Sequence, residues 1–254
     1  MPPKTEKCMI ADNQQGQALS YVFGVYFGDG SVSRRFTRQD GSENKCFQLS
    51  TIDRDFRDHA ATQVALAFPN CKPYKHEHQR GKNRMNYTLR VDNIGTYIEQ
   101  AAGKKTVIPN IVYASQENTK AFLEGLLDSE GWATDTNYLK RNEIYLSIGI
   151  AVGSELMHEF RRMFESFGIK CGKMHSRKLP SGRVMKQMNF NTVSFLESGL
   201  EFHCWRIQRR LEAHKAARKV LADIAASKLP DGVSFNDYKQ SVRNSVIESL
   251  RTMV

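Results

Sequence analysis

Hydrophobic residues recur at helical spacing near the N-terminus. Leu19, Phe23 and Tyr26 lie on one face of the segment over residues 15–27, which predicts an amphipathic helix. Gly30 follows at a position where helices commonly end with a glycine in the left-handed conformation. We therefore expect the first helix to end at this glycine, with a conformation that only glycine adopts easily.

Strand-like segments follow in pairs, separated by turn-rich sequence. In the first half, strands are predicted over residues 32–38, 45–52, 72–79 and 84–91, and helices over 53–68 and 93–102. In the second half, a helix over 119–129 precedes strands near 132–139, 143–152, 172–178 and 183–190, with helices over 154–167 and 192–199. Each half therefore has the order αββαββα, which predicts an α+β fold of two pseudo-symmetric halves.

An internal repeat supports this division. The motif over residues 22–30 ends in Asp29 and glycine, and the motif over residues 123–131 ends in Glu130 and glycine, 101 positions later (130 − 29). Turn glycines occur 52 positions after each acid (81 − 29 and 182 − 130). Matching offsets of this kind indicate duplication of one structural unit.

Each motif also contains small residues spaced four apart, which would allow two helix backbones to pack closely. They are Gly24 and Gly28 in the first motif and Gly125 and Ser129 in the second. Close packing would hold Asp29 and Glu130 side by side, where their charges repel one another. A divalent cation would relieve this repulsion, and carboxylate ligands suit Mg²⁺.

The charge of the chain favours a polyanionic partner. Lys and Arg number 37 against 27 Asp and Glu, giving a net charge of +10 over 254 residues. The five cysteines form no C-x-x-C pair, which argues against a disulfide framework or a zinc ribbon. Neither a membrane-spanning run nor a signal-peptide core is evident, so we expect an intracellular, soluble protein that does not contact membranes, in the cytoplasm or an organelle.

Four parts follow from these patterns: a first half over residues 1–102, a linker over 103–116, a second half over 117–199 and a C-terminal helical extension over 200–254. The extension is interpreted either as a helical buttress packed on the core or as an accessory DNA-binding arm. Ser234 and Asp237 resemble a capping box for its last helix.

Residues 15–199, with their two motifs, hairpins and basic charge, resemble the LAGLIDADG homing endonucleases in their single-chain form. The resemblance implies that the motif helices form the interface between the halves. It implies that each half lays a curved four-stranded antiparallel sheet, covered by helices on one face, into the DNA major groove. Both strands would be cut across the minor groove, leaving short 3′ overhangs.

The resemblance also assigns the site. Asp29 and Glu130 would be the catalytic acids and metal ligands, and the backbone carbonyls of Gly28 and Ser129 would face the metals. We expect two or more Mg²⁺ ions, with Mn²⁺ as a substitute and Ca²⁺ supporting binding without cleavage. By position, Lys186 and Arg90 are candidates for the basic residues that assist catalysis.

The hairpins supply the candidate DNA contacts, since arginine suits guanine edges and lysine suits phosphates. These candidates are Arg34, Arg38, Lys45, Gln48, Lys75, Arg80, Lys82, Arg84, Lys140, Arg141, Lys178 and Arg183, with Asn86 and Asn189 as further adenine contacts. The phase of each strand, and so the face on which each side chain lies, is left open.

Two positions depart from the motif pattern. Phe27 stands where the motif has its first acid, and Glu130 replaces the usual aspartate, which allows asymmetric cleavage or a nicking bias. We expect a monomeric, intron-encoded or free-standing site-specific endonuclease of duplex DNA that depends on Mg²⁺. The alternatives are a maturase of the same fold that binds intron RNA and a non-cleaving DNA-binding regulator.

Overall fold

The computed structural model describes residues 13–37, 43–79, 84–134, 147–182, 184–212 and a few positions beyond them. The first half contains α1 (Asn13–Phe27), β1 (Ser31–Thr37), β2 (Glu43–Thr51), α2 (Arg54–Ala67), β3 (Tyr74–Gln79), β4 (Met85–Val91) and α3 (Gly95–Ala102). The second contains η2 (Asn110–Tyr113), α4 (Gln116–Glu130), β5 (Gly131–Thr134), β6 (Ser147–Val152), α6 (Met157–Ser166), β7 (Cys171–Lys178), β8 (Val184–Phe190) and α7 (Thr192–Glu197). The predicted order αββαββα is confirmed in both halves.

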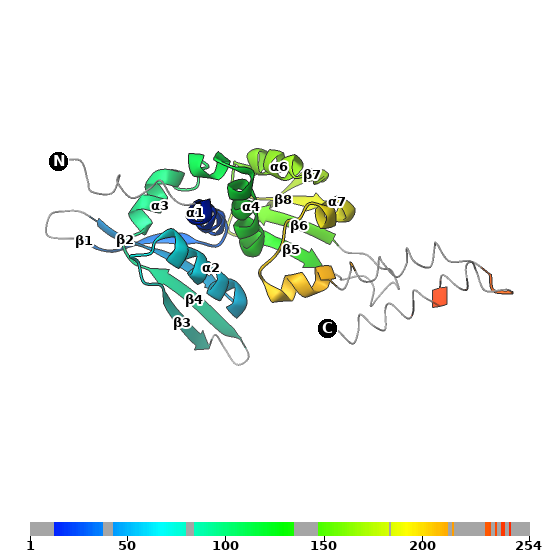
Figure 1. Ribbon diagram of the computed structural model, residues 1–254, viewed down its shortest axis with the longest axis horizontal. Coiled ribbons are helices and arrows are strands. Elements are labelled where there is room, and N and C mark those ends of the chain that lie inside the picture. The colour runs from blue at the N-terminus through cyan, green and yellow to red at the C-terminus, as the bar shows by residue number, and fades with distance from the viewer. Residues whose placement is uncertain are drawn as a thin grey trace.

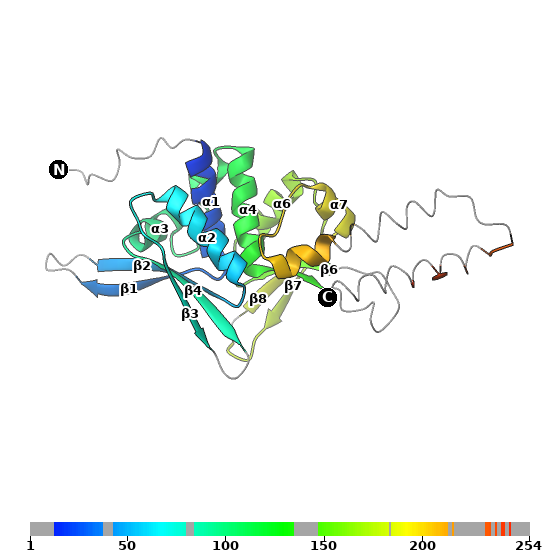
Figure 2. The same ribbon diagram turned by 60° about the horizontal axis from the view of Figure 1, so that its bottom comes forward.

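Each half builds one antiparallel sheet of four strands. The strand orders are β1-β2-β4-β3 and β5-β6-β8-β7, so the two sheets have the same topology. Corresponding central pairs also match, because Phe47 lies opposite Val91 in the first sheet and Ile148 lies opposite Phe190 in the second. Figure 2 shows the helices on one side of the sheets, with the β3–β4 and β7–β8 hairpins extending away from them. We call the sheet face opposite the helices the open face.

Helices α1 and α4 lie side by side between the two sheets (Figure 1). Their apolar side chains belong to one core that continues through both halves. The ring of Phe27 illustrates this continuity, since its centre lies 5.7 Å from that of Phe122 and 5.9 Å from that of Phe160. Burial of such aromatic side chains is a main source of stability, so the halves are joined by their core.

One local expectation is wrong. Gly30 does not have a positive φ; a side chain there would clash with Val25, Tyr26 and the ring of Phe47, so close packing rather than a left-handed cap requires glycine. Asp53 occupies the N-cap position of α2, but its side chain makes no capping hydrogen bond. Its carboxylate binds a residue of the C-terminal segment instead, as described below.

The described part of the C-terminal extension packs against the core. Phe202, Cys204 and Ile207 are buried, and a helix covers residues 205–212. This placement agrees with the buttress interpretation. Farther along, the amide of Asp237 donates a 3.1 Å hydrogen bond to Oγ of Ser234, which confirms the predicted cap. In the described part of the chain, none of the helices combines the length and apolar character that crossing a membrane requires.

Candidate metal and nucleic-acid site

The motif helices approach most closely at their glycines. A methyl group on Gly24 of α1 would lie 2.0 Å from the carbonyl oxygen of Phe122, and one on Gly125 of α4 would lie 2.3 Å from that of Tyr21. Non-bonded atoms do not approach this closely, so a side chain at either glycine would force the helices apart. The prediction that these small residues bring the two backbones together is confirmed.

The contact continues to the ends of both helices. A methyl group on Gly28 would lie 2.3 Å from Cβ of Ser129 and 2.9 Å from Cγ of Glu130. Glu130 is the last residue of α4, and Asp29 directly follows Gly28. Asp29 is exposed as a residue, although protein atoms surround much of its carboxyl, and Glu130 is partly exposed. One acid from each half is thus delivered to the place where the two helices meet.

A lysine between the halves reaches the end of α1. Nζ of Lys105 donates a 2.8 Å hydrogen bond to the carbonyl oxygen of Gly28 and lies 5.2 Å from the centre of the Tyr26 ring. Burial raises the pKa of the Asp29 carboxyl, and the Lys105 ammonium opposes that rise. In the protein alone, a side-chain cation thus faces the carbonyl that the resemblance assigns to a metal.

The available donors fit a hard divalent cation. The carboxylates of Asp29 and Glu130 and the carbonyl of Gly28 supply oxygen atoms only, and oxygen donors suit Mg²⁺, Mn²⁺ and Ca²⁺ better than softer metals. Partial burial of the Asp29 carboxyl disfavours its charged form. A bound cation would offset this effect.

A pocket of about 330 Å³ opens beside this site. Asp29 and Ser129 line it from the ends of the motif helices, whereas Ser50 and Asn86 line it from β2 and β4. Nδ2 of Asn86 donates a 2.7 Å hydrogen bond to Oγ of Ser50. The pocket therefore connects Asp29, at the junction of the motif helices, with the strands of the first sheet.

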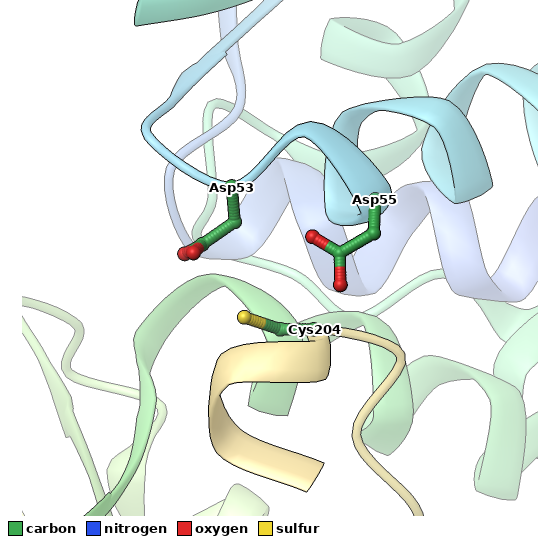
Figure 3. A group of neighbouring side chains, drawn as sticks. All are labelled: Asp53, Asp55 and Cys204. Carbon is green, nitrogen blue, oxygen red and sulfur yellow. The ribbon is translucent and has the colours of Figure 1, made fainter. Parts of the chain in front are cut away.

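A second acidic group lies at the start of α2. Asp53, Asp55 and Cys204 have ligand atoms within 4.8 Å of one another, and Figure 3 shows the two aspartates across from the cysteine. Protein groups already occupy both carboxylates, since Asp53 forms a two-point ion pair with Arg206 and Asp55 accepts the amide of Trp205. Burial raises the pKa of the Cys204 thiol to about 12, which disfavours the thiolate that a metal would need. We interpret this group as a clamp between α2 and the C-terminal segment.

Strand alternation decides which predicted DNA contacts reach the open face of the first sheet. Phe47 and Leu89 are buried toward the helices, so the intervening residues Gln48 and Arg90 lie on the open face, where they are paired in register. Nε of Arg90 also lies 3.3 Å from Oδ1 of Asp92. By the same alternation, the open face includes Ser33, Ser50, Tyr74, His76, His78, Asn86 and Thr88.

Three predicted contacts lie on the helix side instead: Arg34, Lys45 and Lys75. Each forms an ion pair with an acid, namely Glu43 at 3.2 Å, Glu99, and Asp58 at 3.0 Å, respectively. Lys45 and Lys75 pair with acids of α3 and α2, on the side of the sheet that faces away from the expected DNA. The sequence did not predict this placement, because it did not show which alternate positions of each strand point toward the helices.

The second sheet repeats this division. Ile150 and Met188 are buried and paired, so Gln187 and Asn189 lie on the open face. Lys186 has the same parity as Met188 and forms a 2.5 Å ion pair with Glu155, which places it on the helix side. Its predicted catalytic role stays a prediction that this position does not favour.

Two of the remaining predicted contacts lie in the described part of the chain. Lys178 and Arg84 are exposed at the end of β7 and just before β4. The other six lie outside the described residues: Arg38, Arg80, Lys82, Lys140, Arg141 and Arg183. Strand alternation places Lys178 on the helix side, because its partner Val184 has the parity of Lys186 and Met188.

Three basic residues of interest were not predicted: Lys105, Arg177 and Arg206. Arg177 is exposed on the open face of β7, a position that strand alternation would have found once the pairing with β8 was known. Lys105 and Arg206 contact residues 77 and 153 positions away. Contacts over such separations leave no local signal in the sequence.

A buried polar network ties the C-terminal segment to the motif helices. Asp128 accepts hydrogen bonds from the Tyr21 hydroxyl at 2.6 Å and from the amides of His203 and Cys204 at 2.7 and 3.2 Å. Nδ1 of His203 lies 2.9 Å from the same carboxylate, and its ring stacks on His59 at 3.8 Å. The clamp described above and this network hold the segment against α1, α2 and α4.

No family model matches the chain. Two similar proteins are the uncharacterized MJ0314 and MJ0398 of Methanocaldococcus jannaschii, which are 25% and 24% identical over 136 residues. The matches cover 53% and 54% of this chain and 48% and 46% of those proteins. The chain thus spans about half the length of the curated relatives it matches.

Several solved structures share the architecture. I-DmoI in complex with DNA and Mn has a TM-score of 0.52 at 18% identity, covering 74% of this chain and 98% of that one. A double mutant of I-SmaMI has a TM-score of 0.50 at 9% identity, covering 92% and 96%. The N-terminal LAGLIDADG domain of DUF199/WhiA has a TM-score of 0.50 at 11% identity, covering 76% and 82%. The chain therefore has the two-domain LAGLIDADG fold of these structures.

Proposed function

We propose that the protein is a site-specific endonuclease of duplex DNA that depends on a divalent cation. The observation that carries this proposal is the meeting of Gly28 with Ser129 and Glu130, which delivers one acid from each half to one place. The structural neighbour I-DmoI is a homing endonuclease whose structure contains DNA and Mn, and its fold agrees with this use of the site.

The open faces of the two sheets would bind the major groove on either side of the central site. Gln48 and Arg90 in the first sheet and Gln187, Asn189 and Arg177 in the second offer the hydrogen-bonding groups that read base edges and phosphates. Because one chain supplies both halves, we propose that the protein acts as a monomer.

Asp29 and Glu130 would hold two or more Mg²⁺ ions, with the carbonyls of Gly28 and Ser129 facing them. When bound, the cations supply activation of water and stabilisation of the leaving oxygen. The two acids fix the line between the halves along which both strands would be cut, across the minor groove with short 3′ overhangs. Mn²⁺ would substitute, whereas Ca²⁺ would support binding without cleavage.

One observation favours a second candidate, a DNA-binding regulator that does not cleave. The Lys105 ammonium already binds the Gly28 carbonyl and interacts with Asp29, so the protein itself partly neutralises the paired site. A site neutralised in this way could bind DNA without a metal ion.

Cleavage of a plasmid library of candidate insertion sites, with Mg²⁺ or Ca²⁺, separates these candidates. We expect defined double-strand breaks with Mg²⁺ only. Glu130→Gln should abolish cleavage of at least one strand and leave DNA affinity unchanged, while Glu117→Gln, at the exposed opposite end of α4, should cleave normally. Undiminished cleavage of both strands by Glu130→Gln would refute the assignment, and footprints on duplex DNA without scission would support the regulator.

A further inference from the structure

The C-terminal segment places an arginine in the pocket that Asp29 lines. Nε and Nη2 of Arg206 each donate a 3.0 Å hydrogen bond, to Oδ1 and Oδ2 of Asp53 respectively. The Arg206 side chain is 44% exposed, whereas that of Asp53 is 14% exposed. The guanidinium thus remains accessible from solvent although its fork is fully engaged by one carboxylate.

Arg206 lines the same pocket as the candidate site. The pocket of about 330 Å³ is bounded by Asp29 and Ser129 from the motif helices, by Ser50 from β2, and by Asp53 and Arg206. A DNA backbone that approaches the paired acids along the first sheet would therefore pass this guanidinium.

Arg206 binds Asp53 through the same pair of N–H groups that an arginine uses to bind a phosphate. A guanidinium binds carboxylate and phosphate oxygens through the same two parallel N–H bonds. Because the Arg206 side chain is 44% exposed, a phosphate can reach the guanidinium from solvent and compete with Asp53 for its N–H groups. The net charge of +10 also draws polyanions toward the surface.

We propose that Arg206 contacts a backbone phosphate of the bound duplex, and that Asp53 occupies the place of that phosphate in the free protein. This inference rests on the proposed binding of duplex DNA. It gives the C-terminal segment a role in binding besides packing, since the clamp at α2 holds the guanidinium at the edge of the pocket.

The test measures binding of a fluorescein-labelled, 40-base-pair duplex of random sequence, in Ca²⁺, as a function of KCl concentration. Random sequence suffices because phosphate contacts do not depend on base identity. Arg206→Ala should weaken binding and make the slope of log K against log[KCl] shallower by about 1. Asp53→Asn should tighten binding, because the guanidinium is no longer held by a charged partner.

Arg161→Ala is the matched control, since Arg161 forms a comparable 2.8 Å ion pair with Glu165 on α6 and does not line this pocket. It should leave the slope unchanged. Arg206→Lys, which keeps the charge and loses the fork, should retain the slope with reduced affinity. Urea unfolding of each variant shows whether it is folded under the binding conditions.

An unchanged slope in folded Arg206→Ala would overturn the inference, as would equal losses of affinity in Arg206→Ala and Asp53→Asn, which would indicate a purely structural clamp. In both cases the proposed function would stand, because the wild-type protein still binds. A wild-type protein that binds no duplex would overturn the proposed function together with the inference.

Discussion

Residues related by the internal repeat differ where the C-terminal segment docks. Phe27 and Asp128 occupy the same position of the two motifs, 101 residues apart (128 − 27). Phe27 packs against the rings of Phe122 and Phe160, whereas Asp128 binds Tyr21 and the backbone at His203. The sequence shows that the two residues differ, but it does not show that Asp128 accepts hydrogen bonds from a segment 75 positions away.

Lys105 is the residue whose placement most changes the electrostatics of the site. Burial raises the pKa of the Asp29 carboxyl overall, and the Lys105 ammonium opposes that rise. We expect Lys105→Met to raise the pKa of the Asp29 carboxyl, so that a smaller fraction is ionised and able to bind a cation at mildly acidic pH. Carbon-13 NMR titration of the metal-free protein measures this pKa, with Asp29→Asn providing the assignment.

Lys104→Met is a suitable control for this titration, because Lys104 is exposed in the same turn. It should leave the Asp29 titration close to that of the wild-type protein. If the two lysine variants shifted the carboxyl equally, the effect would reflect overall charge rather than the contact of Lys105 with the end of α1.

At the scale of elements, helices were predicted better than strand faces. The spacing of Gly24 and Gly28 specified a close helix contact without knowledge of the fold, because residues four apart share one helix face. Strand faces required the buried partners to be known. Lys45 and Gln48 are three positions apart on β2, so they lie on opposite faces. Only the contact of Lys45 with Glu99 and the buried partners of β2 show that Lys45 is on the helix side and Gln48 on the open face.

The closest helix contact gives a prediction for stability. Gly24→Ala places a methyl group 2.0 Å from the carbonyl oxygen of Phe122, a rigid backbone atom. We expect the free energy of unfolding to fall by about 3 kcal/mol or more, since overpacking at backbone contacts cannot be relieved by a side-chain rotation. Urea unfolding followed by circular dichroism measures this change.

Gly16→Ala, on the same helix, separates this clash from helix propensity. Its methyl group would meet side-chain atoms, namely the end of Asn118 at 3.2 Å and Cδ1 of Ile111 at 3.7 Å. Alanine is favoured over glycine in a helix by about 1 kcal/mol, so this variant should be as stable as the wild-type protein or slightly more stable. Similar effects of the two substitutions would show that the helix contact tolerates a side chain at Gly24.

At the scale of the whole molecule, the sequence predicted the two halves and their common order but not the path of the chain beyond them. The repeat gave the architecture because each copy carries the same pattern of helices and hairpins. The C-terminal segment has no counterpart in the repeat, and its docking depends on buried polar contacts. Two of those contacts are the bond of His203 to Asp128 and the stacking of His203 on His59.

These two histidines make the attachment of the C-terminal segment sensitive to pH, with opposite signs. Burial and the charge of His203 lower the pKa of His59 from 6.5 to about 4, so the unfolded state binds more protons in this range and stability falls as the pH drops from 6.5 to about 4. Burial alone would lower the pKa of His203, but Asp128 raises it overall. The stabilisation that protonated His203 contributes is therefore fully present below pH 6.5 and is lost as the pH rises through the raised pKa of His203.

The two histidines together contribute most to stability near pH 6.5. Substitution of His59 should remove only the loss of stability that occurs below this pH. His59→Phe keeps an aromatic ring against His203, and its loss of stability between pH 6.5 and 4 should be smaller than that of the wild-type protein. Urea midpoints measured from pH 4 to 8.5 give the difference, with His76→Phe, exposed on the open face, as control. Parallel pH profiles for the wild-type protein and His59→Phe would mean that His59 has the same pKa in the folded and unfolded chains. The C-terminal segment would then be held by hydrogen bonds and apolar contacts whose strength does not depend on the protonation of His59.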